Sequence, residues 1–478
     1  MKFNKNTFRF ITVIIITTIL LLPNILQAKE IDLKDAIDWG IQHNYDLEAI
    51  KYNIETSERD LAILDSNKAL QINLELKPIW ALRGQESDIS DENSNQSSAT
   101  SETSLFTLTA KKTIADDLNI STEISWNENN FADMSSFEES VKDINANIQL
   151  EKQIYPDSYT QSEQQIFQTE NDLKKEVEEL AWKEAEKQID FIESYLNLVR
   201  SIEEVNLADK KFLLATEELE RVEQQIQLGE SGYQQEAEAK IALMESKNEF
   251  FNLKQNLIQQ QKKWYLELNL PEDIQVQFKE EPAYLETLRS RMKQLTLENE
   301  KQETLCKQVL EKHYEIKNAY IDKESVLKEA EWTENEGKPQ INIYGGYDLS
   351  DDYWSAMLDL SWNLTDGGAQ KLKEEEAEAA ILQKEKELDQ LIKTLQLEMN
   401  QMIDQDQYNQ LNLQAKFAAL EKEQFTKNVL EKQYQEKIIS STQWQNQLIA
   451  LAEEKLKVKE AQDLLFVNRL RLAHFLGI

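Results

Sequence analysis

Several long stretches of the chain contain neither proline nor glycine, and two of them, rich in Glu, Lys, Gln and Leu, constrain the fold more than any other feature. The first runs from Ser158 to Leu228 and the second from Ala369 to Lys437. A continuous helix over either stretch would be a rod roughly 100 Å long, at about 1.5 Å per residue. Only 10 Gly and 6 Pro occur among 478 residues. With abundant Glu, Gln, Lys, Leu and Ala, this composition predicts long paired helices rather than a compact globule.

Apolar residues along both rods recur at helical spacing. They step by four and three residues, in Ile189, Ile192, Leu196 and Val199 and again in Leu388, Ile392, Leu395, Met399 and Met402. This is coiled-coil spacing, and the opposite helix faces carry Glu, Lys and Gln. A rod this thin cannot bury its own apolar stripe, so it must lie beside a returning helix and neighbouring copies of the chain.

A shorter helix and a group of strands are predicted before each rod. In the first half the helix covers Asp32–Lys68, and the polar stretches Gln85–Ser104 and Glu128–Lys142 are expected to be solvated loops. Strands with alternating apolar residues are expected at Ile72–Leu82, Phe106–Ile114, Leu118–Trp126 and Ile144–Ile154. In the second half one strand face should hold Trp354, Ala356, Leu358, Leu360, Trp362 and Leu364. The aromatic residues in these segments fit membrane-crossing strands and a half-buried soluble sheet equally well.

This order of elements occurs twice, which predicts an internal two-fold repeat. Ala36–Asn73 aligns without a gap on Leu305–Asn342, and Ala242-Leu243 aligns on Ala450-Leu451. We expect a signal peptide at 1–28, a first repeat at 29–283 and a second at 284–478. The first holds strands at about 70–155 and a helical hairpin at 158–270, and the second holds strands at about 340–364 and a hairpin at 369–478. Chance similarity among Glu-, Lys- and Leu-rich helices explains the helical matches equally well, but it does not explain the matching order of elements.

The first 28 residues have the pattern of an export signal. Lys2, Lys5 and Arg9 precede an apolar run over Phe10–Leu22, and cleavage is expected between Ala28 and Lys29. The alternative is a membrane anchor, but a run of about 13 residues falls short of the ~20 that a spanning helix needs. The only cysteine, Cys306, cannot form an internal disulfide.

The composition argues against several classes of function. A net charge of −35 argues against nucleic acid or an anionic lipid surface as the main partner. The histidines His43, His313 and His474 stand apart on helical segments, where a structural role is expected. The sequence contains no phosphate-binding glycine loop, nucleophile elbow or metal-spaced cluster. We therefore expect no catalytic residue, no metal, no cofactor, and a protein that is not an enzyme.

Four segments resemble the TolC-like outer-membrane efflux family. In Leu358–Gly368 an alternating strand ends in an Asp-Gly-Gly turn before a long helix, and Ile154–Asp157 is a weaker version in the first half. Gln227–Gly232 is similar to the tip where one long helix turns into its partner. Its counterpart is Tyr434–Ser440, with Lys437 where a glycine is usual. The four segments lie in the order that the family has, so the resemblance covers essentially the whole chain after the signal.

The resemblance implies a mainly α protein with a β-barrel part. Long antiparallel coiled-coil hairpins would form a periplasmic tunnel, and transmembrane strands of a homotrimer would close one α/β barrel in outer-membrane lipid. It also implies efflux of small molecules or type I protein secretion, with a periplasmic adaptor (membrane fusion) protein and an inner-membrane pump. The alternative is a soluble exported coiled-coil adaptor or envelope spacer. That class does not explain why alternating aromatic strands interrupt the helices at matching points of both halves.

The resemblance assigns roles to the turns between the long helices. The residues expected to contact the adaptor are Gly229, Glu230, Ser231, Gly232, Lys437, Ile438, Ile439, Ser440 and Ser441. The inner aperture is expected just past these turns. There the best-known members carry an acidic pair, whereas this chain has Gln443 and Asn446. Glu236 and Glu238, just past the first turn, are the residues able to restore a negative ring.

A second departure from the family concerns the strands. The family has two strands in each half, while four are expected in the first half of this chain. The extra pair, 106–114 and 118–126, either enlarges the barrel or stands outside it.

Overall fold

The computed structural model describes residues 29–76, 104–114, 118–127, 144–156, 160–230, 232–294 and 302–477. The chain divides into two compact units. We call Met1–Lys51, Glu178–Ile316 and Leu391–Ile478 the helical unit, and Tyr52–Val177 with Lys317–Gln390 the sheet unit. Several predictions lie outside the described residues: the signal at 1–28, the loops at 85–103 and 128–142, and the first strand beyond Leu76.

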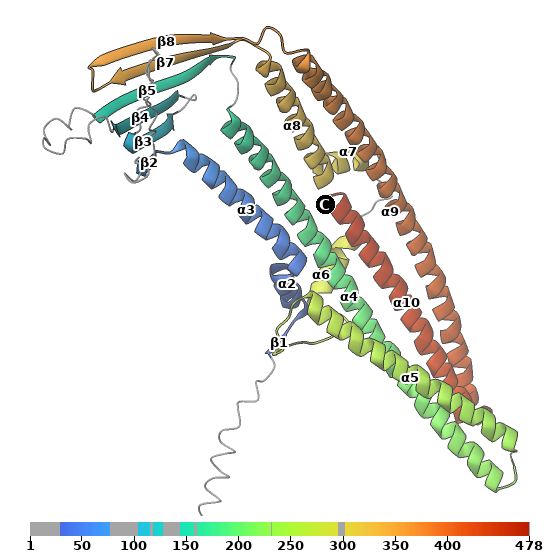
Figure 1. Cartoon of the computed structure of the whole chain (residues 1–478). Helices are drawn as coiled ribbons and strands as arrows, with labels where there is room; N and C mark the ends of the chain where they lie inside the picture. Colours follow the sequence, from blue (N-terminus) through green and yellow to red (C-terminus); the bar gives the residue numbers. More distant parts are fainter. Residues whose placement is uncertain are drawn as a thin grey trace, which may run out of the picture. The chain divides into compact units, whose positions relative to one another are not determined.

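The sheet unit contains six strands in one antiparallel sheet (Figure 1). They are β2 (Gln71–Leu76), β3 (Ser104–Ile114), β4 (Leu118–Asn127), β5 (Ile144–Tyr155), β7 (Gln340–Asp348) and β8 (Tyr353–Ser361), in the order β2-β3-β4-β5-β7-β8. The expected strands are confirmed, except that Trp362 and Leu364 lie past the end of β8. The extra pair, β3 and β4, lies within the sheet, between β2 and β5.

Nine helices are described. They are α2 (Leu33–His43), α3 (Tyr45–Lys68), α4 (Gln161–Gln227), α5 (Tyr233–Glu267), α6 (Ala283–Gln294), α7 (Gln302–Lys312), α8 (Tyr314–Glu336), α9 (Ala369–Gln435) and α10 (Ser441–Phe475). The expected rods are α4 and α9, with 67 residues each, and their return helices α5 and α10 have 35 each. In the helical unit α4 lies beside α5 and α9 beside α10, and β1 (Lys29–Ile31) pairs in parallel with β6 (Ile274–Val276) (Figure 1). No described helix combines the length and the apolar character needed to cross a membrane.

The helix expected over Asp32–Lys68 is in fact two helices, separated at Asn44. The buried side chain of Asn44 accepts hydrogen bonds from the backbone N–H groups of Asp46 (3.1 Å) and Leu47 (3.3 Å), so it caps α3. His313 does the same between α7 and α8, because its Nδ1 accepts from the backbone N–H of Glu315 at 3.3 Å. The prediction of one unbroken helix was wrong here because neither proline nor glycine marks the break.

The predicted apolar stripe of the first rod lies in the core of the helical unit. Ile189, Ile192, Leu196 and Val199 are all buried, beside residues from α2, α5 and α10. Two polar aromatic groups in this core are hydrogen-bonded, as buried polar groups must be. Trp264 Nε1 donates to the Phe191 carbonyl at 3.2 Å, and the Tyr195 hydroxyl accepts from the Lys279 backbone N–H at 2.8 Å.

Two histidines lie against one tryptophan at another place in the helical unit. The ring centroid of Trp182 is 4.3 Å from that of His313 and 4.0 Å from that of His474. Burial, with a smaller contribution from His474, lowers the pKa of His313 to about 4, and burial also lowers the pKa of His474. The expectation that these histidines stand apart was therefore wrong.

The buried His313 should make stability depend on acid. An unfolded histidine titrates near pH 6.5, so between that value and about pH 4 the unfolded chain binds a proton that the native His313 rejects. The stabilisation is complete above pH 6.5 and is lost as the pH falls, by on the order of 3 kcal/mol. The charged groups facing the pair are Lys183, Glu186 and Glu315.

The measurement is the melting temperature of the wild type and of His313→Asn between pH 7 and 4.5. Asparagine keeps a cap for α8 but does not titrate, so the variant should lose less stability in acid. Equal acid sensitivity of the two proteins would contradict this assignment.

Candidate functional sites in the sheet and at the helix turns

The register of the six strands sorts their residues into two faces of opposite character. We call apolar face the side that carries Ile72, Leu74, Leu76, Phe106, Leu108, Ile120, Ile124, Ile148, Leu150, Ile343, Tyr347, Trp354, Leu358 and Leu360. We call polar face the side that carries Gln71, Asn73, Glu75, Thr107, Lys111, Asn119, Glu123, Asn147, Glu151, Asp348 and Asp359. Each face is continuous over β3 and β4, so the extra pair has the same two-sided pattern as the other strands.

The apolar face is uncovered. Leu74 is 52% exposed, Leu358 64% and Leu360 65%. Among the described elements, the strands make extensive contacts only with one another. A soluble sheet buries such a face, because contiguous exposed apolar patches of this extent mark a surface that meets a protein or a lipid.

Aromatic and basic residues occupy opposite ends of the apolar face. Phe106, Tyr347 and Trp354 lie near the strand ends remote from the helices. Lys112 and Lys152 lie near the opposite strand ends, at the end of the sheet where β2 follows α3 and β5 precedes α4. Aromatic girdles and snorkelling lysines are typical of the two rims of a membrane-embedded sheet.

The two turns between the long helices have the same backbone conformation. In the first, Gly229 has a φ of +75° and the Glu230 N–H donates to the Gln225 carbonyl at 2.8 Å. In the second, Lys437 has a φ of +60° and the Ile438 N–H donates to the Gln433 carbonyl at 2.8 Å. This is the left-handed cap that usually selects glycine, so Lys437 adopts the conformation of the glycine it replaces.

The start of each return helix is capped in the same way. The Gly232 N–H donates to Gln235 Oε1 at 3.0 Å. The Ser440 N–H donates to Gln443 Oε1 at 3.0 Å, and Ser440 Oγ accepts from the Gln443 N–H at 3.2 Å. Gln443 is expected at the inner aperture, and its side-chain amide also completes the capping box at the start of α10. Gly232 has a φ of −108°, which any residue adopts.

The other expected site residues near the turns are mostly exposed. They include Gly229, Glu230, Gly232, Lys437, Ile438, Ser440, Ser441, Glu238 and Asn446, whereas Ile439 and Glu236 are half-buried, and Ser231 and Ala28 lie outside the described residues. Glu236 forms an ion pair with Lys240, one helical turn later. Glu238 accepts a hydrogen bond from Gln234 Nε2 at 3.1 Å.

Polar links that the sequence analysis missed join the two hairpins near their tips. Arg221 Nη1 donates to Thr442 Oγ1 at 3.1 Å, and this hydroxyl donates to Glu218 Oε2 at 3.2 Å. Farther from the tips, Lys211 forms an ion pair with Glu453 at 2.8 Å. The local sequence does not predict these links, because more than 200 residues separate the partners.

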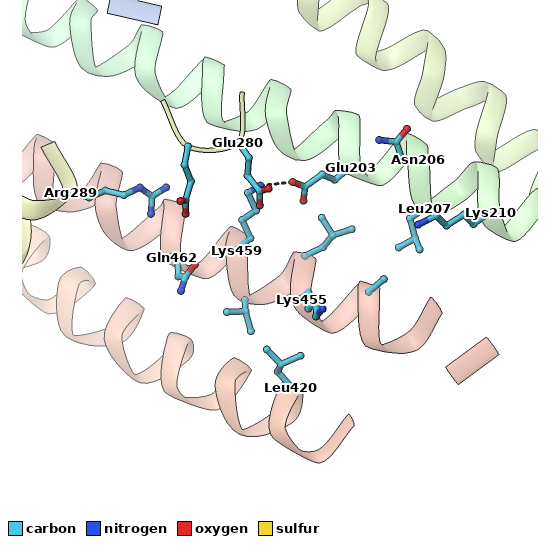
Figure 2. A pocket seen from close by; sticks show the side chains of 14 residues that line it. Glu203, Asn206, Leu207, Lys210, Glu280, Arg289, Leu420, Lys455, Lys459 and Gln462 are labelled. Carbon is cyan, nitrogen blue, oxygen red and sulfur yellow. Dashed lines mark hydrogen bonds and ion pairs between the residues drawn. The ribbon is translucent and has the colours of Figure 1, made fainter. Parts of the chain in front are cut away.

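A pocket of about 500 Å³ lies between α4, α10 and the segment before α6 (Figure 2). Lys459 Nζ is 2.5 Å from Glu203 Oε1 and 2.9 Å from Glu280 Oε1. Burial opposes the charge of Lys459, but the two carboxylates together raise its pKa, and the hydrogen bond from Lys459 lowers the pKa of Glu280. One lysine thus forms ion pairs with two carboxylates, so the three side chains together keep one net negative charge.

Over the ranges that the structure describes, no group of three or more His, Cys, Asp and Glu side chains is arranged to hold a metal ion.

The chain matches no protein-family model, and no curated protein matches its sequence. Solved structures match it well. They include CusC, which forms a transmembrane channel (12% identity, 93% of this chain and 91% of CusC covered, TM-score 0.63), and the outer-membrane protein VceC of Vibrio cholerae (11%, 93% and 96%, 0.59). The CmeC outer-membrane channel of Campylobacter jejuni is also similar (10%, 93% and 85%, 0.60).

These similarities identify the fold. It is the TolC-like fold of outer-membrane channels, as the sequence resemblance predicted. The proteins that share it here are described as channels or outer-membrane proteins and not as enzymes, in agreement with the expectation that this chain is not an enzyme.

The left-handed turns yield a paired prediction. Gly229→Ala should destabilise the first turn by about 1 kcal/mol, because an L side chain resists this conformation. Lys437→Gly should relieve the same strain and stabilise the second turn by a similar amount. Hydrogen exchange of the Glu230 and Ile438 amides would measure both effects.

The matched control is Gly232→Ala, whose φ is ordinary and whose added methyl group would meet open space. In Gly232→Ala the amides of Glu230 and Ile438 should exchange as in the wild type. Equal changes at positions 229 and 232 would show that left-handed strain is not the cause.

Proposed function

We propose that this chain is one protomer of an outer-membrane channel-tunnel. The tunnel exports small molecules, or proteins by type I secretion, together with a periplasmic adaptor (membrane fusion) protein and an inner-membrane pump. The sheet unit lies in outer-membrane lipid and the long helices lie in the periplasm.

The two-faced sheet carries this proposal. Its apolar face is exposed on β2, β7 and β8 and half-buried on β3 and β4. The strands β3, β4, β5, β7 and β8 have 9 to 12 residues, which matches the 9–11 residues that cross a bilayer. Its polar face suits a water-filled interior. A soluble adaptor or envelope spacer, the alternative from the sequence, would leave this apolar face in water.

Exposed apolar residues on α9 support a homotrimer. Leu397, Leu411 and Phe425 follow one another at intervals of two heptads and are 58%, 65% and 71% exposed. In the part of the chain that the structure describes nothing buries them, whereas Leu395 and Met399 on the same helix are buried. Neighbouring copies are the partners that a coiled-coil stripe of this kind selects.

The turns between the long helices are the proposed adaptor contact. Gly232→Val places a bulky side chain on an exposed site whose backbone accepts it, so the fold should be preserved. We expect export to fall several-fold at matched protein levels. Asn252→Val, at an exposed position in the middle of α5, is the control and should export normally. Equal export by both variants would remove the first turn from the adaptor surface.

The inner aperture yields a prediction about ion selectivity. A threefold ring of amides at Gln443 and Asn446 neither concentrates cations nor titrates, unlike a ring of carboxylates. We expect conductance of the wild type in planar bilayers to change little between about pH 4 and 7. Gln443→Asp should raise cation preference and introduce a pH dependence, while Glu238→Gln should change neither.

The opposite result is equally informative. If Gln443→Asp leaves selectivity unchanged and Glu238→Gln abolishes it, the constriction lies past the first turn. A protein that forms no pores in bilayers would overturn the channel itself.

A further inference from the structure

We propose that the sheets of three copies close into a single barrel of 18 strands, in which β8 of each copy pairs with β2 of the next. The inference rests on the proposed trimeric channel, and it adds the number of strands in the barrel and the pairing between copies. A trimer built from four strands per copy would have only 12.

The number of strands permits this closure. The sheet has six strands, antiparallel throughout, with β2 and β8 at its two edges. Because six is even, β2 and β8 run in opposite directions, so β8 meets the β2 of the next copy as an antiparallel neighbour. Closed barrels in outer membranes are built from an even number of antiparallel strands.

The strand register supplies a suitable tilt. Starting at Gln71, the first residue of β2, successive paired residues are Lys111, Ser121, Gln149, Gly346 and Ser355. Ser355 lies six positions before Ser361, the last residue of β8. If Gln71 of the next copy pairs with Ser361, the register advances by six residues over six strands. With about 3.3 Å per residue and about 4.8 Å between strands, the strands tilt by roughly 35°. Outer-membrane barrels tilt by about 35–45°.

The two edges are also chemically matched in this register. Leu74 of one copy lies opposite Leu358 of its neighbour, on the apolar face, and Asn73 lies opposite Asp359, on the polar face. Both faces therefore continue across the junction, and no charged residue of these edges is turned toward lipid. A register shifted by one residue would reverse every side chain of one edge.

The closed wall has a consequence for transport. Barrel diameter grows roughly in proportion to strand number, so 18 strands give a barrel about half again as wide as 12. Barrels of about 16–18 strands leave an aqueous channel instead of an interior filled by side chains. The polar face would line it with Glu75, Glu123, Glu151, Asp348 and Asp359 against Lys111, a negative lining that favours cations over anions.

Cross-linking in the full chain tests the junction. In a Cys306→Ser background, Asn73→Cys with Asp359→Cys places two thiols opposite each other on the polar face. A short thiol-specific cross-linker should shift most of the protein to about three times the monomer mass on a denaturing gel. Asn73→Cys with Leu358→Cys is the control, because its thiols lie on opposite faces, and it should remain largely monomeric.

Native mass spectrometry and bilayer conductance distinguish a failure of the β8–β2 junction from a failure of the trimeric channel. Trimers that conduct but do not cross-link through positions 73 and 359, or through Gln71→Cys with Ser361→Cys, would overturn the junction and leave the channel intact. A non-conducting monomer would overturn both. Electron microscopy of the cross-linked trimer should resolve 18 strands, and 12 would contradict the proposal.

Discussion

An open strand edge cannot remain in hydrocarbon, and in the proposed channel this constraint governs the whole molecule. Lipid offers no hydrogen bonds, so each backbone N–H and C=O of β2 and β8 must find a partner on another strand. The six strands of one chain satisfy only their internal pairs and leave both edges open. If the apolar face directs the sheet into lipid, as proposed, the chain needs further copies of itself. The helices also need further copies of the chain, because Leu397, Leu411 and Phe425 on α9 form an exposed apolar stripe.

The long helices show how one backbone geometry is reached with different residues. Both turns require a residue in the left-handed region, and the chain uses Gly229 in one and Lys437 in the other. Both return helices require a cap, which Gly232 supplies with backbone alone and Ser440 supplies with a side chain. Agreement at the level of hydrogen bonds, despite different side chains, is what descent from a duplicated unit would leave behind. The internal repeat nevertheless stays a prediction from the sequence.

Strong periodicity and the absence of breakers made most elements predictable from sequence. The rods α4 and α9 and the strands β3, β4 and β5 begin and end within about three residues of their expected bounds. The rest depends on particular side chains and on strand pairing. Asn44 and His313 end helices because their side chains cap the next helix two or three residues on, and the apolar periodicity does not reveal such caps. The position of β3 and β4 inside the sheet likewise follows from pairing, which composition does not encode.

The size of the additional segment is itself explained by closure. A single added strand would leave an odd number in each copy, and in the proposed channel it would also bring the chain to the wrong side of the membrane before α4. A hairpin such as β3–β4 returns the chain to the side from which it left, so α3 and α4 keep their places at the same end of the strands. It also keeps both faces in phase, because the register continues from β2 through β3 and β4 to β5. A pair of strands is therefore the smallest insertion that widens such a wall while preserving the helices that meet it.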